Sequence, residues 1–216
     1  GGSWSYYRTL PEQWTLAYDN FSLIVKPTDF GHLGFFAEQG PQWQWLQQQI
    51  RTANRPIRLL NTFAYTGVGS LAAASAGASV VHLDAADGIV AWAKENAQLA
   101  GLDNAPIRWL VEDVSKFAAR EIRRGHRYDA LVLDPPSFGR GSKGEVWKLE
   151  RDLQPFLDLC RQLLSPQPLF VLLSAHTPGC TPLTLQNLLT EMMAPYGGHL
   201  TSREMVIPEQ DRKSVV

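Results

Sequence analysis

From residue 57 onward, short apolar segments alternate with longer segments of helical composition. The apolar segments end near Asn61, Asp84, Leu110, Asp134 and Ser174, and a sixth ends near Ile207. Alternation of this kind predicts βαβ units, because a strand that leads into a crossover helix returns as a parallel neighbour. The sequence therefore predicts an α/β fold with a doubly wound, mostly parallel, Rossmann-like sheet.

A smaller unit precedes this sheet. Between Trp14 and Val25, two strand-like segments flank Asp19-Asn20, and this pattern predicts a β-hairpin with a two-residue turn. Residues 42–51 then have helical composition. We therefore divide the chain into an N-terminal β-hairpin with a lead-in helix, residues 1–55, and a sheet domain, residues 56–216.

The charge balance limits how the chain can bind nucleic acid. It has 20 Lys+Arg against 21 Asp+Glu, a formal net charge of -1. A protein that holds nucleic acid by neutralising phosphates alone carries a basic excess, so contact with RNA would need a local patch. Two basic groups fit phosphate contacts and solvated helix faces equally well. They are Arg120, Arg123, Arg124 and Arg127, and Arg140, Lys143, Lys148 and Arg151.

Cysteine usage and hydropathy indicate a cytoplasmic protein. The two cysteines, Cys160 and Cys180, are too few for a disulfide framework and lie outside any zinc-binding spacing, so we expect no metal site. No segment approaches about 18 consecutive apolar residues, and the first residues lack the pattern of a signal peptide. We therefore expect no membrane association.

A glycine-rich turn follows the first sheet strand, from Asn61 to Gly69. Its glycines lack Cβ atoms, which lets a ligand approach the backbone where a helix begins. The second strand ends at Asp84, where a carboxylate can accept hydrogen bonds from ribose hydroxyls. Together these features predict an adenosine-containing cofactor. The spacing Gly67-x-Gly69-x-x-Ala72 also matches the dinucleotide fingerprint, so a nicotinamide-dependent oxidoreductase remains an alternative.

Two further strand ends carry acidic residues. Glu112-Asp113 follows the third strand, where Asp113 can accept a hydrogen bond from an adenine amino group, although a surface acidic pair would look the same. Asp134-Pro-Pro-Ser-Phe138 follows the fourth. The prolines hold the backbone extended and leave carbonyl groups without ladder partners. Carbonyls, carboxylate and Phe138 suit a planar, nitrogen-bearing substrate that stacks on the ring.

These residues resemble class I S-adenosylmethionine-dependent methyltransferases. The resemblance rests on the segment from Asn61 to Gly67, Asp84, the segment from Ala91 to Asn96, Asp113 and the Asp134-to-Phe138 element. More narrowly, they are similar to the bacterial branch that methylates 23S ribosomal RNA at cytosine carbon 5 or guanine nitrogen 7. The similarity runs from about Pro27 to about His176 and includes a lead-in segment, Gly34 to Gln39.

The resemblance implies a methyltransferase sheet, S-adenosylmethionine as cofactor and RNA as substrate, with ribosomal RNA as the substrate class of that branch. It places the methionine part against the loop after the first strand, the ribose at Asp84 and the adenine at Asp113. The implied cofactor-binding residues are Asn61, Phe63, Tyr65, Thr66, Gly67, Gly69, Asp84, Ala85, Asp113 and Asp134. The implied catalytic residues, which face the methyl acceptor, are Asp134, Pro135, Pro136 and Phe138.

The cysteines depart from the carbon-5 pattern. Carbon-5 methylation of cytosine needs a thiolate that adds to the ring, and relatives that use one place it just after the fifth strand. Here that stretch reads Ser174-Ala-His176-Thr, with Cys180 beyond it. We therefore expect transfer to a nitrogen, with Asp134 orienting or deprotonating the acceptor and His176 as a candidate second acid or base. Carbon-5 chemistry and a non-catalytic RNA- or protein-binding module on the same fold remain alternatives.

The C-terminal segment leaves the last strands of the sheet open. Residues 199–207 can supply a sixth strand, whereas residues 211–216 barely suffice for a seventh. Either the last strand is abbreviated or the natural chain is longer. An unpaired edge strand can pair with a second copy, so an edge-strand dimer is one option for an otherwise undetermined oligomeric state.

Overall fold

The computed structural model describes residues 4–29, 31–141, 144–208 and 214–215. Its central sheet has five parallel strands in the order β5-β4-β3-β6-β9. These strands are β3 (Arg58–Thr62), β4 (Ser79–Asp84), β5 (Ile107–Val111), β6 (Ala130–Leu133) and β9 (Phe170–Leu173). The predicted doubly wound parallel sheet is confirmed. From β3 the chain adds strands on one side, β4 and then β5, and it then crosses over to add β6 and β9 on the other side. Ligands bind at this switch point between β3 and β6 in such folds.

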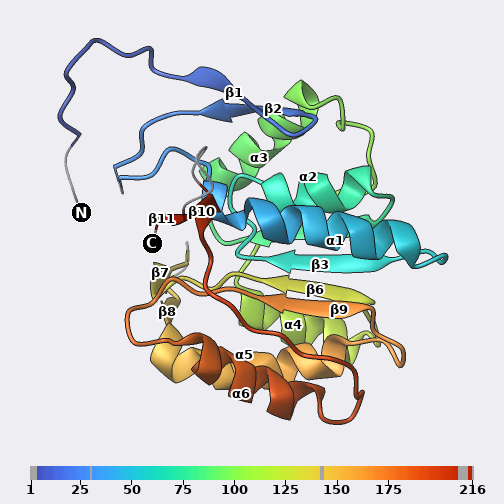
Figure 1. The fold of residues 1–216 in the computed structure, drawn as a ribbon. Helices are drawn as coiled ribbons and strands as arrows, with labels where there is room; N and C mark the ends of the chain where they lie inside the picture. Colours follow the sequence, from blue (N-terminus) through green and yellow to red (C-terminus); the bar gives the residue numbers. More distant parts are fainter. Residues whose placement is uncertain (1–3, 30, 142–143, 209–213, 216) are drawn as a thin grey trace.

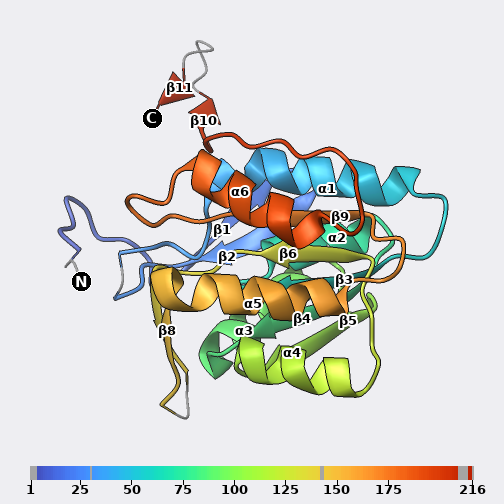
Figure 2. The same cartoon turned by 90° about the horizontal axis from the view of Figure 1, so that it is seen from below.

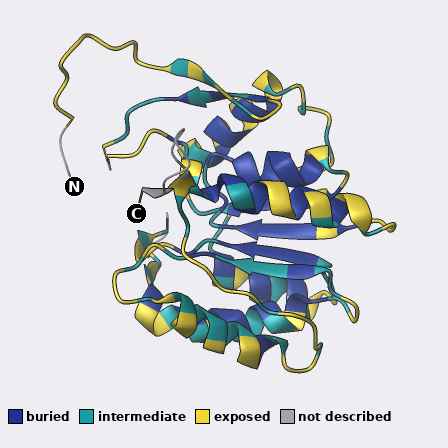
Figure 3. Ribbon diagram, in the orientation of Figure 1, coloured by how far each residue is buried: buried dark blue, intermediate teal, exposed yellow. Residues whose placement is uncertain are grey.

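Helices cover both faces of the sheet (Figures 1 and 2). On one face lie α1 (Gly40–Thr52), α2 (Val68–Ser75) and α3 (Asp87–Leu99), and on the other lie α4 (Val114–Arg123), α5 (Leu149–Leu163) and α6 (Pro182–Met193). Successive strand residues serve opposite faces: Leu59 packs in the first apolar cluster and Leu60 in the second. The strands are therefore buried on both sides (Figure 3). No helix among the described residues is long and apolar enough to cross a membrane.

The predicted N-terminal hairpin is confirmed. Strands β1 (Trp14–Tyr18) and β2 (Phe21–Val25) pair antiparallel around Asp19-Asn20. The hairpin docks on α3 through its backbone, because the amide of Ile24 donates to Asn96 Oδ1 at 2.8 Å and the carbonyl of Ile24 accepts from Trp92 Nε1 at 3.0 Å. A 3-10 turn, η1 (Ala37–Gln39), then leads into α1. The division of the chain at residue 55 stays a prediction.

A second hairpin, absent from the sequence prediction, follows β6. Strands β7 (Phe138–Arg140) and β8 (Val146–Lys148) pair antiparallel at the carboxyl-terminal edge of the sheet. Three-residue strands are too short to show an alternating pattern, so no periodic signal marks them. Trp147 anchors the hairpin by donating from Nε1 to the carbonyl of Pro136 at 2.7 Å and by packing edge-to-face on Phe63.

The predicted sixth strand is wrong. Residues 199–206 have no regular structure, and β10 (Ile207–Pro208) pairs only with β11 (Ser214–Val215), outside the central sheet. The stretch from residue 199 to 204 is mostly polar and exposed, so it offers little apolar surface to bury against β9. Lys143 and residues 211–213, which the sequence predictions included, lie outside the described residues. The edge-strand dimer stays a prediction.

A buried carboxylate ties α4 to the start of β6. Glu121 is fully buried, and its Oε2 accepts from the Tyr128 hydroxyl at 2.8 Å and lies 2.8 Å from Nδ1 of His126. Burial raises the pKa of Glu121, but the hydrogen bonds from His126 and Tyr128 together lower it by a larger amount. The pKa of Glu121 therefore lies below the usual value. The buried carboxylate therefore depends on these two donors.

We expect Tyr128→Phe to lower the free energy of unfolding by about 1–3 kcal/mol, because Glu121 stays buried with one donor fewer. Urea denaturation measures the change. Tyr196→Phe is the control, since its half-buried hydroxyl donates only to the carbonyl of Arg161 and should cost less than about 1 kcal/mol.

The two variants also differ in pH dependence. Because the folded-state pKa of Glu121 is depressed, its stabilising contribution is present above the ordinary carboxyl pKa and is lost as the pH falls through the folded-state value. The difference in stability between wild type and Tyr128→Phe should therefore narrow on acidification. Equal losses in the two variants at neutral pH would contradict a special role for Glu121 and Tyr128.

Candidate active site

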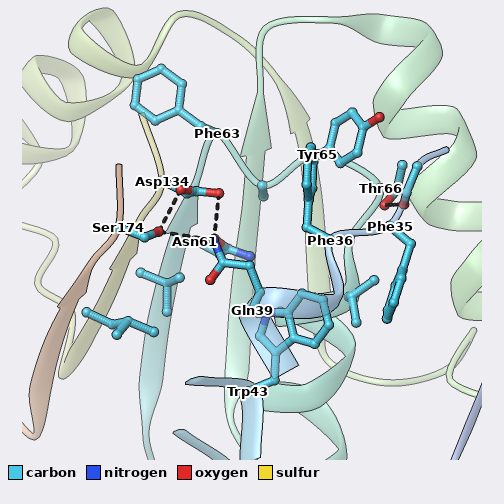
Figure 4. Close-up of a pocket in the computed structure, with 17 residues that line it drawn as sticks. Phe35, Phe36, Gln39, Trp43, Asn61, Phe63, Tyr65, Thr66, Asp134 and Ser174 are labelled. Carbon is cyan, nitrogen blue, oxygen red and sulfur yellow. Dashed lines mark hydrogen bonds between the residues drawn. The ribbon is translucent and has the colours of Figure 1, made fainter. Parts of the chain in front are cut away.

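A pocket opens at the carboxyl-terminal ends of β3 and β6, the switch point in the strand order. Three parts of the chain line it (Figure 4). The lead-in segment and α1 contribute Gly34, Phe35, Phe36, Gln39 and Trp43; β3 and its loop contribute Asn61 and residues 63–69; β6 and β9 contribute Val132, Asp134, Leu172 and Ser174. Of the predicted site residues, the structure brings together Asn61, Phe63, Tyr65, Thr66, Gly67, Gly69 and Asp134. Asp84, Ala85, Asp113, Pro135, Pro136 and Phe138 are not among the lining residues.

The loop after β3 has an unusual backbone. Phe63 and Tyr65 have φ angles of 53° and 49°, in the left-handed region that non-glycine residues rarely adopt. Gly67 has a φ of 93° at the start of α2, where an added Cβ would lie 3.0 Å from the Cβ of Ala93. Left-handed residues of this kind cost about 1–3 kcal/mol each unless the surroundings hold them. The loop therefore needs anchors.

Asp84 is the first anchor. Its Oδ2 accepts from the amide of Tyr65 at 3.0 Å and its Oδ1 accepts from the amide of Ala86 at 3.1 Å. Burial raises the pKa of Asp84, and the amides of Ala86, Tyr65 and Ala85 oppose that rise. Asp84 thus shapes the loop while its carboxylate stands at the end of β4, where the ribose role was predicted. That role stays a prediction.

Asn96 and Thr66 supply further anchors. Asn96 is fully buried in α3; its Nδ2 donates to the carbonyl of Thr66 at 2.9 Å while its Oδ1 accepts from β2. The Thr66 hydroxyl donates to the carbonyl of Gly34 at 2.6 Å. One amide side chain thus joins the loop to the N-terminal hairpin, and one hydroxyl joins it to the lead-in segment. The sequence placed Asn96 at the end of the helical segment from Ala91 to Asn96, on which the family resemblance partly rests, but did not predict this contact.

Asp113 serves as the N-cap of α4. Its Oδ1 accepts from the amide of Lys116 at 2.9 Å, which satisfies one of the unpaired amides of the first helical turn. A carboxylate has two oxygens, so capping does not exclude a second partner. The adenine contact of Asp113 stays a prediction.

Asp134 is held by side chains from distant parts of the chain. Its Oδ1 accepts from the Ser174 hydroxyl at 2.6 Å, and its Oδ2 accepts from Gln39 Nε2 at 3.2 Å. Gln39 Nε2 also donates to Ser174 Oγ at 3.3 Å, so the three residues form a closed network (Figure 4). His176 Nε2 lies 3.6 Å from Asp134 Oδ1. The sequence named the segments that contain Gln39 and Ser174 but gave neither residue a role in the site.

The environment of Asp134 favours proton uptake. Burial raises its pKa; the hydrogen bond from Ser174 and the nearby His176 oppose this, and the charge of Glu38 adds to it. The resulting pKa is above the ordinary value. A carboxyl with a raised pKa at the edge of a pocket suits acceptance of a proton or a hydrogen bond from a substrate nitrogen.

The residues after Asp134 face outward from this network. Pro135 is buried, whereas Pro136 is exposed and its carbonyl is already occupied by Trp147. The Phe138 side chain is 51% exposed, with the guanidinium of Arg140 5.7 Å from its ring centre. Phe138 is therefore accessible, and its stacking on a substrate stays a prediction, while Pro136 has less accepting capacity than expected.

Neither cysteine is disposed to act as a nucleophile. Cys160 is fully buried in the apolar cluster under α5, and burial raises its pKa well above the usual value. Cys180 is half-buried, its pKa is also raised by burial, and it is not a lining residue of the pocket. A raised pKa reduces the thiolate fraction that nucleophilic attack requires.

Four of the eight predicted basic residues already bond to an acidic side chain or a backbone carbonyl. Arg120 pairs with Glu112, Arg124 Nη1 lies 3.7 Å from Glu121 Oε1, and Arg151 Nε lies 2.7 Å from Asp152 Oδ1. Arg127 donates to the carbonyl of His126. Helix α4 begins at the pocket edge of the sheet and ends at the opposite edge, because it leads to the start of the parallel strand β6. The arginines at its C-terminal end therefore lie away from the pocket. Near the pocket, the hairpin residues Arg140 and Lys148 remain exposed.

The pocket suits a positively charged ligand. Among its lining residues the charged side chain is Asp134, and five are aromatic: Phe35, Phe36, Trp43, Phe63 and Tyr65. Aromatic faces and a carboxylate attract a cation, whereas a dinucleotide pyrophosphate would meet no lysine or arginine among these lining residues. The aromatic and acidic lining residues therefore fit a cofactor with a positively charged sulfonium better than a dinucleotide.

Solved structures share this architecture. The crystal structure of the SAM-dependent methyltransferase from Agrobacterium tumefaciens covers 89% of this chain at 46% sequence identity, with a TM-score of 0.85, and the match covers 62% of that chain. The crystal structure of SMU.776, a putative methyltransferase complexed with SAH, covers 88% of this chain at 26% identity with a TM-score of 0.75, and 48% of that chain is matched.

Curated relatives are similar in sequence to this chain. Ribosomal RNA large subunit methyltransferase I of Aeromonas salmonicida is 31% identical over 166 residues, which are 76% of this chain and 39% of the relative. Methyltransferase K/L of Hahella chejuensis is 31% identical over 144 residues, 66% of this chain and 19% of the relative. The chain thus spans about two fifths or less of these relatives. A profile of the S-adenosylmethionine-dependent methyltransferase family matches residues 11–194, and this chain therefore belongs to that family.

Proposed function

We propose that this chain transfers a methyl group from S-adenosylmethionine to a nitrogen of an RNA base, with ribosomal RNA as the RNA class. The observation that carries the proposal is the partly buried carboxylate of Asp134, held by Gln39 and Ser174 at the edge of a pocket suited to a cation. Membership of the family sets aside the nicotinamide-dependent alternative. A ribosomal substrate would place the protein in the cytoplasm.

The residues of this chain divide the work between binding and proton transfer. When bound, S-adenosylmethionine supplies a methyl group on a positively charged sulfur. The loop of residues 63–69 lines the binding pocket, and Asp84 stands at the end of β4 for the ribose hydroxyls. Where the acceptor nitrogen carries a proton, as an exocyclic amino group does, Asp134 accepts a hydrogen bond from it and takes that proton as the nitrogen–carbon bond forms. Gln39 and Ser174 keep this carboxylate in place.

The choice of nitrogen over carbon rests on the cysteines. Carbon-5 methylation needs a covalent thiolate adduct, but the pKa of Cys180 is raised by burial and Cys160 is fully buried. A nitrogen brings its own lone pair, so alignment and removal of one proton suffice. The structure offers Asp134 for that proton.

Two observations support an RNA base as acceptor. The relatives named above are ribosomal RNA large subunit methyltransferases. In addition, hairpin β7–β8 presents Phe138 and Arg140 just after Asp134, with Phe138 half exposed. An aromatic ring stacks on an unpaired base, and an arginine beside it suits stacking or a phosphate. The basic residues of α4 contribute less, because Arg120 and Arg124 are paired with acids.

Calorimetry and nucleoside mass spectrometry test the proposal together. S-adenosylhomocysteine should bind the purified protein, and RNA from cells that lack the protein should lose one methylated base that returns on complementation. Absence of binding to folded protein would refute the cofactor assignment. Binding without any lost RNA modification would favour a non-catalytic module or another acceptor.

Asp134→Asn should lower kcat by about 10²–10⁴-fold, the range for loss of a general base, while S-adenosylhomocysteine binding changes little. Since the pKa of Asp134 is raised and the carboxylate is the active form, wild-type activity should fall with acidification at a pH above the ordinary aspartate pKa of about 3.9. The exposed Asp158→Asn on α5 is the control. Unchanged kcat in Asp134→Asn would remove the proposed role.

Cys180→Ser should leave methyl transfer within about twofold of wild type, because no thiolate adduct is needed for a nitrogen acceptor. Cys160→Ala serves as the comparison, since it removes the other thiol from a buried position and affects stability rather than chemistry. Steady-state kinetics measure both variants. Loss of activity in a stably folded Cys180→Ser protein would restore the carbon-5 mechanism.

A further inference from the structure

Three buried polar side chains connect the pocket to the interior of the sheet. Asn61 Nδ2 donates to Ser70 Oγ at 2.9 Å, and Ser70 Oγ lies 3.0 Å from Nδ1 of His82. The three residues are 4%, 0% and 0% exposed. Of the three, Asn61 lines the pocket, whereas Ser70 and His82 lie behind it. We call Asn61, Ser70 and His82 the buried polar chain.

The hydrogen atoms fix the direction of this chain. A serine hydroxyl has one proton to donate. Because Ser70 Oγ accepts from Asn61 Nδ2, its own proton is available for Nδ1 of His82, 3.0 Å away, when that nitrogen is unprotonated. Burial, aided by the charge of Lys94, lowers the pKa of His82 to about 3, so the ring is neutral; with Nδ1 accepting from Ser70, its proton is on Nε2. That Nε2 is buried without a partner among the residues that the structure describes.

The direction of the chain decides what Asn61 offers the pocket. With Nδ2 committed to Ser70, the other branch of the amide is the oxygen, an acceptor. Gly69 leaves room for the amide, because a Cβ at that position would lie 3.3 Å from Asn61 Nδ2. If the chain ran in the opposite direction, Asn61 would instead turn its NH₂ group toward the pocket.

The position of Asn61 indicates which end of the cofactor it meets. Asp113, Asp84 and Asn61 stand at the ends of β5, β4 and β3, which are neighbours in the sheet. A ligand with adenine and ribose at the first two therefore brings its amino-acid end to the third. That end carries an ammonium group, which is a donor and needs acceptors.

We propose that Ser70 and His82 are positioning residues that hold the amide oxygen of Asn61 toward the pocket, where it accepts a hydrogen bond from the ammonium group of the cofactor. The inference rests on the proposed function, because it takes S-adenosylmethionine as the ligand. It adds two residues that make no contact with the cofactor and act through Asn61.

Calorimetry with two ligands separates positioning from structural support. S-adenosylhomocysteine carries the ammonium group, whereas 5′-methylthioadenosine lacks the amino-acid end. Ser70→Ala frees the Asn61 amide to rotate and should weaken S-adenosylhomocysteine by about tenfold or more, the loss typical of a hydrogen bond to a charged group. Binding of 5′-methylthioadenosine should stay within about twofold. Ser75→Ala, the same change in the same helix, should alter neither affinity, because Ser75 bonds only to Ala72 and Gln47.

Equal losses for both ligands, or none for either, would overturn the proposal. A second measurement needs no variant: ¹⁵N NMR of His82 in the wild-type protein should show the Nε2-protonated neutral tautomer at pH 7. The Nδ1-protonated tautomer would reverse the direction of the chain and refute the inference. Failure of the wild-type protein to bind S-adenosylhomocysteine would instead refute the proposed function, and the NMR result would still report on the chain.

Discussion

The left-handed backbone of Phe63 and Tyr65 is the constraint on which the site depends. These residues have φ angles of 53° and 49°, and a free chain would relax them. Asp84 holds the loop from β4, and Asn96 holds it from α3. Within the loop, the Thr66 hydroxyl bonds to the carbonyl of Gly34 in the lead-in segment. Because Asn96 also accepts from β2, the N-terminal hairpin braces the cofactor loop rather than standing apart from it.

The sequence predicted the fold well because strands buried on both faces produce short apolar runs that helices separate. It also predicted that Asn61 and Asp134 lie close together, since polar residues near the carboxyl ends of parallel strands gather at one edge; the roles of these residues stay predictions. It missed Gln39, Asn96 and the buried polar chain, whose partners lie on other elements and leave no local periodicity. The predicted sixth strand failed because the few apolar residues between 199 and 207 become only partly buried there.

Two carboxylates, at the ends of the strands on either side of β3, have different surroundings. Asp84 accepts from backbone amides, which fixes the loop and makes the group part of the scaffold. Asp134 accepts from the side chains of Gln39 and Ser174, with His176 nearby. Burial raises the pKa of both, but the partners of Asp134 can exchange for a substrate more readily than backbone amides can. The same residue type thus supports the loop in one place and, in the proposed mechanism, takes part in the chemistry in the other.

The network around Asp134 joins positions that are far apart along the chain. Gln39 is separated from Asp134 by 95 residues and from Ser174 by 135 residues. The anchors of the cofactor loop, in contrast, all lie before residue 97. Contacts of large sequence separation form late, and a protein is synthesised from its N-terminus. In a nascent chain, every residue that anchors the cofactor loop is therefore synthesised before β9, so the acceptor side of the site is the last part whose residues become available.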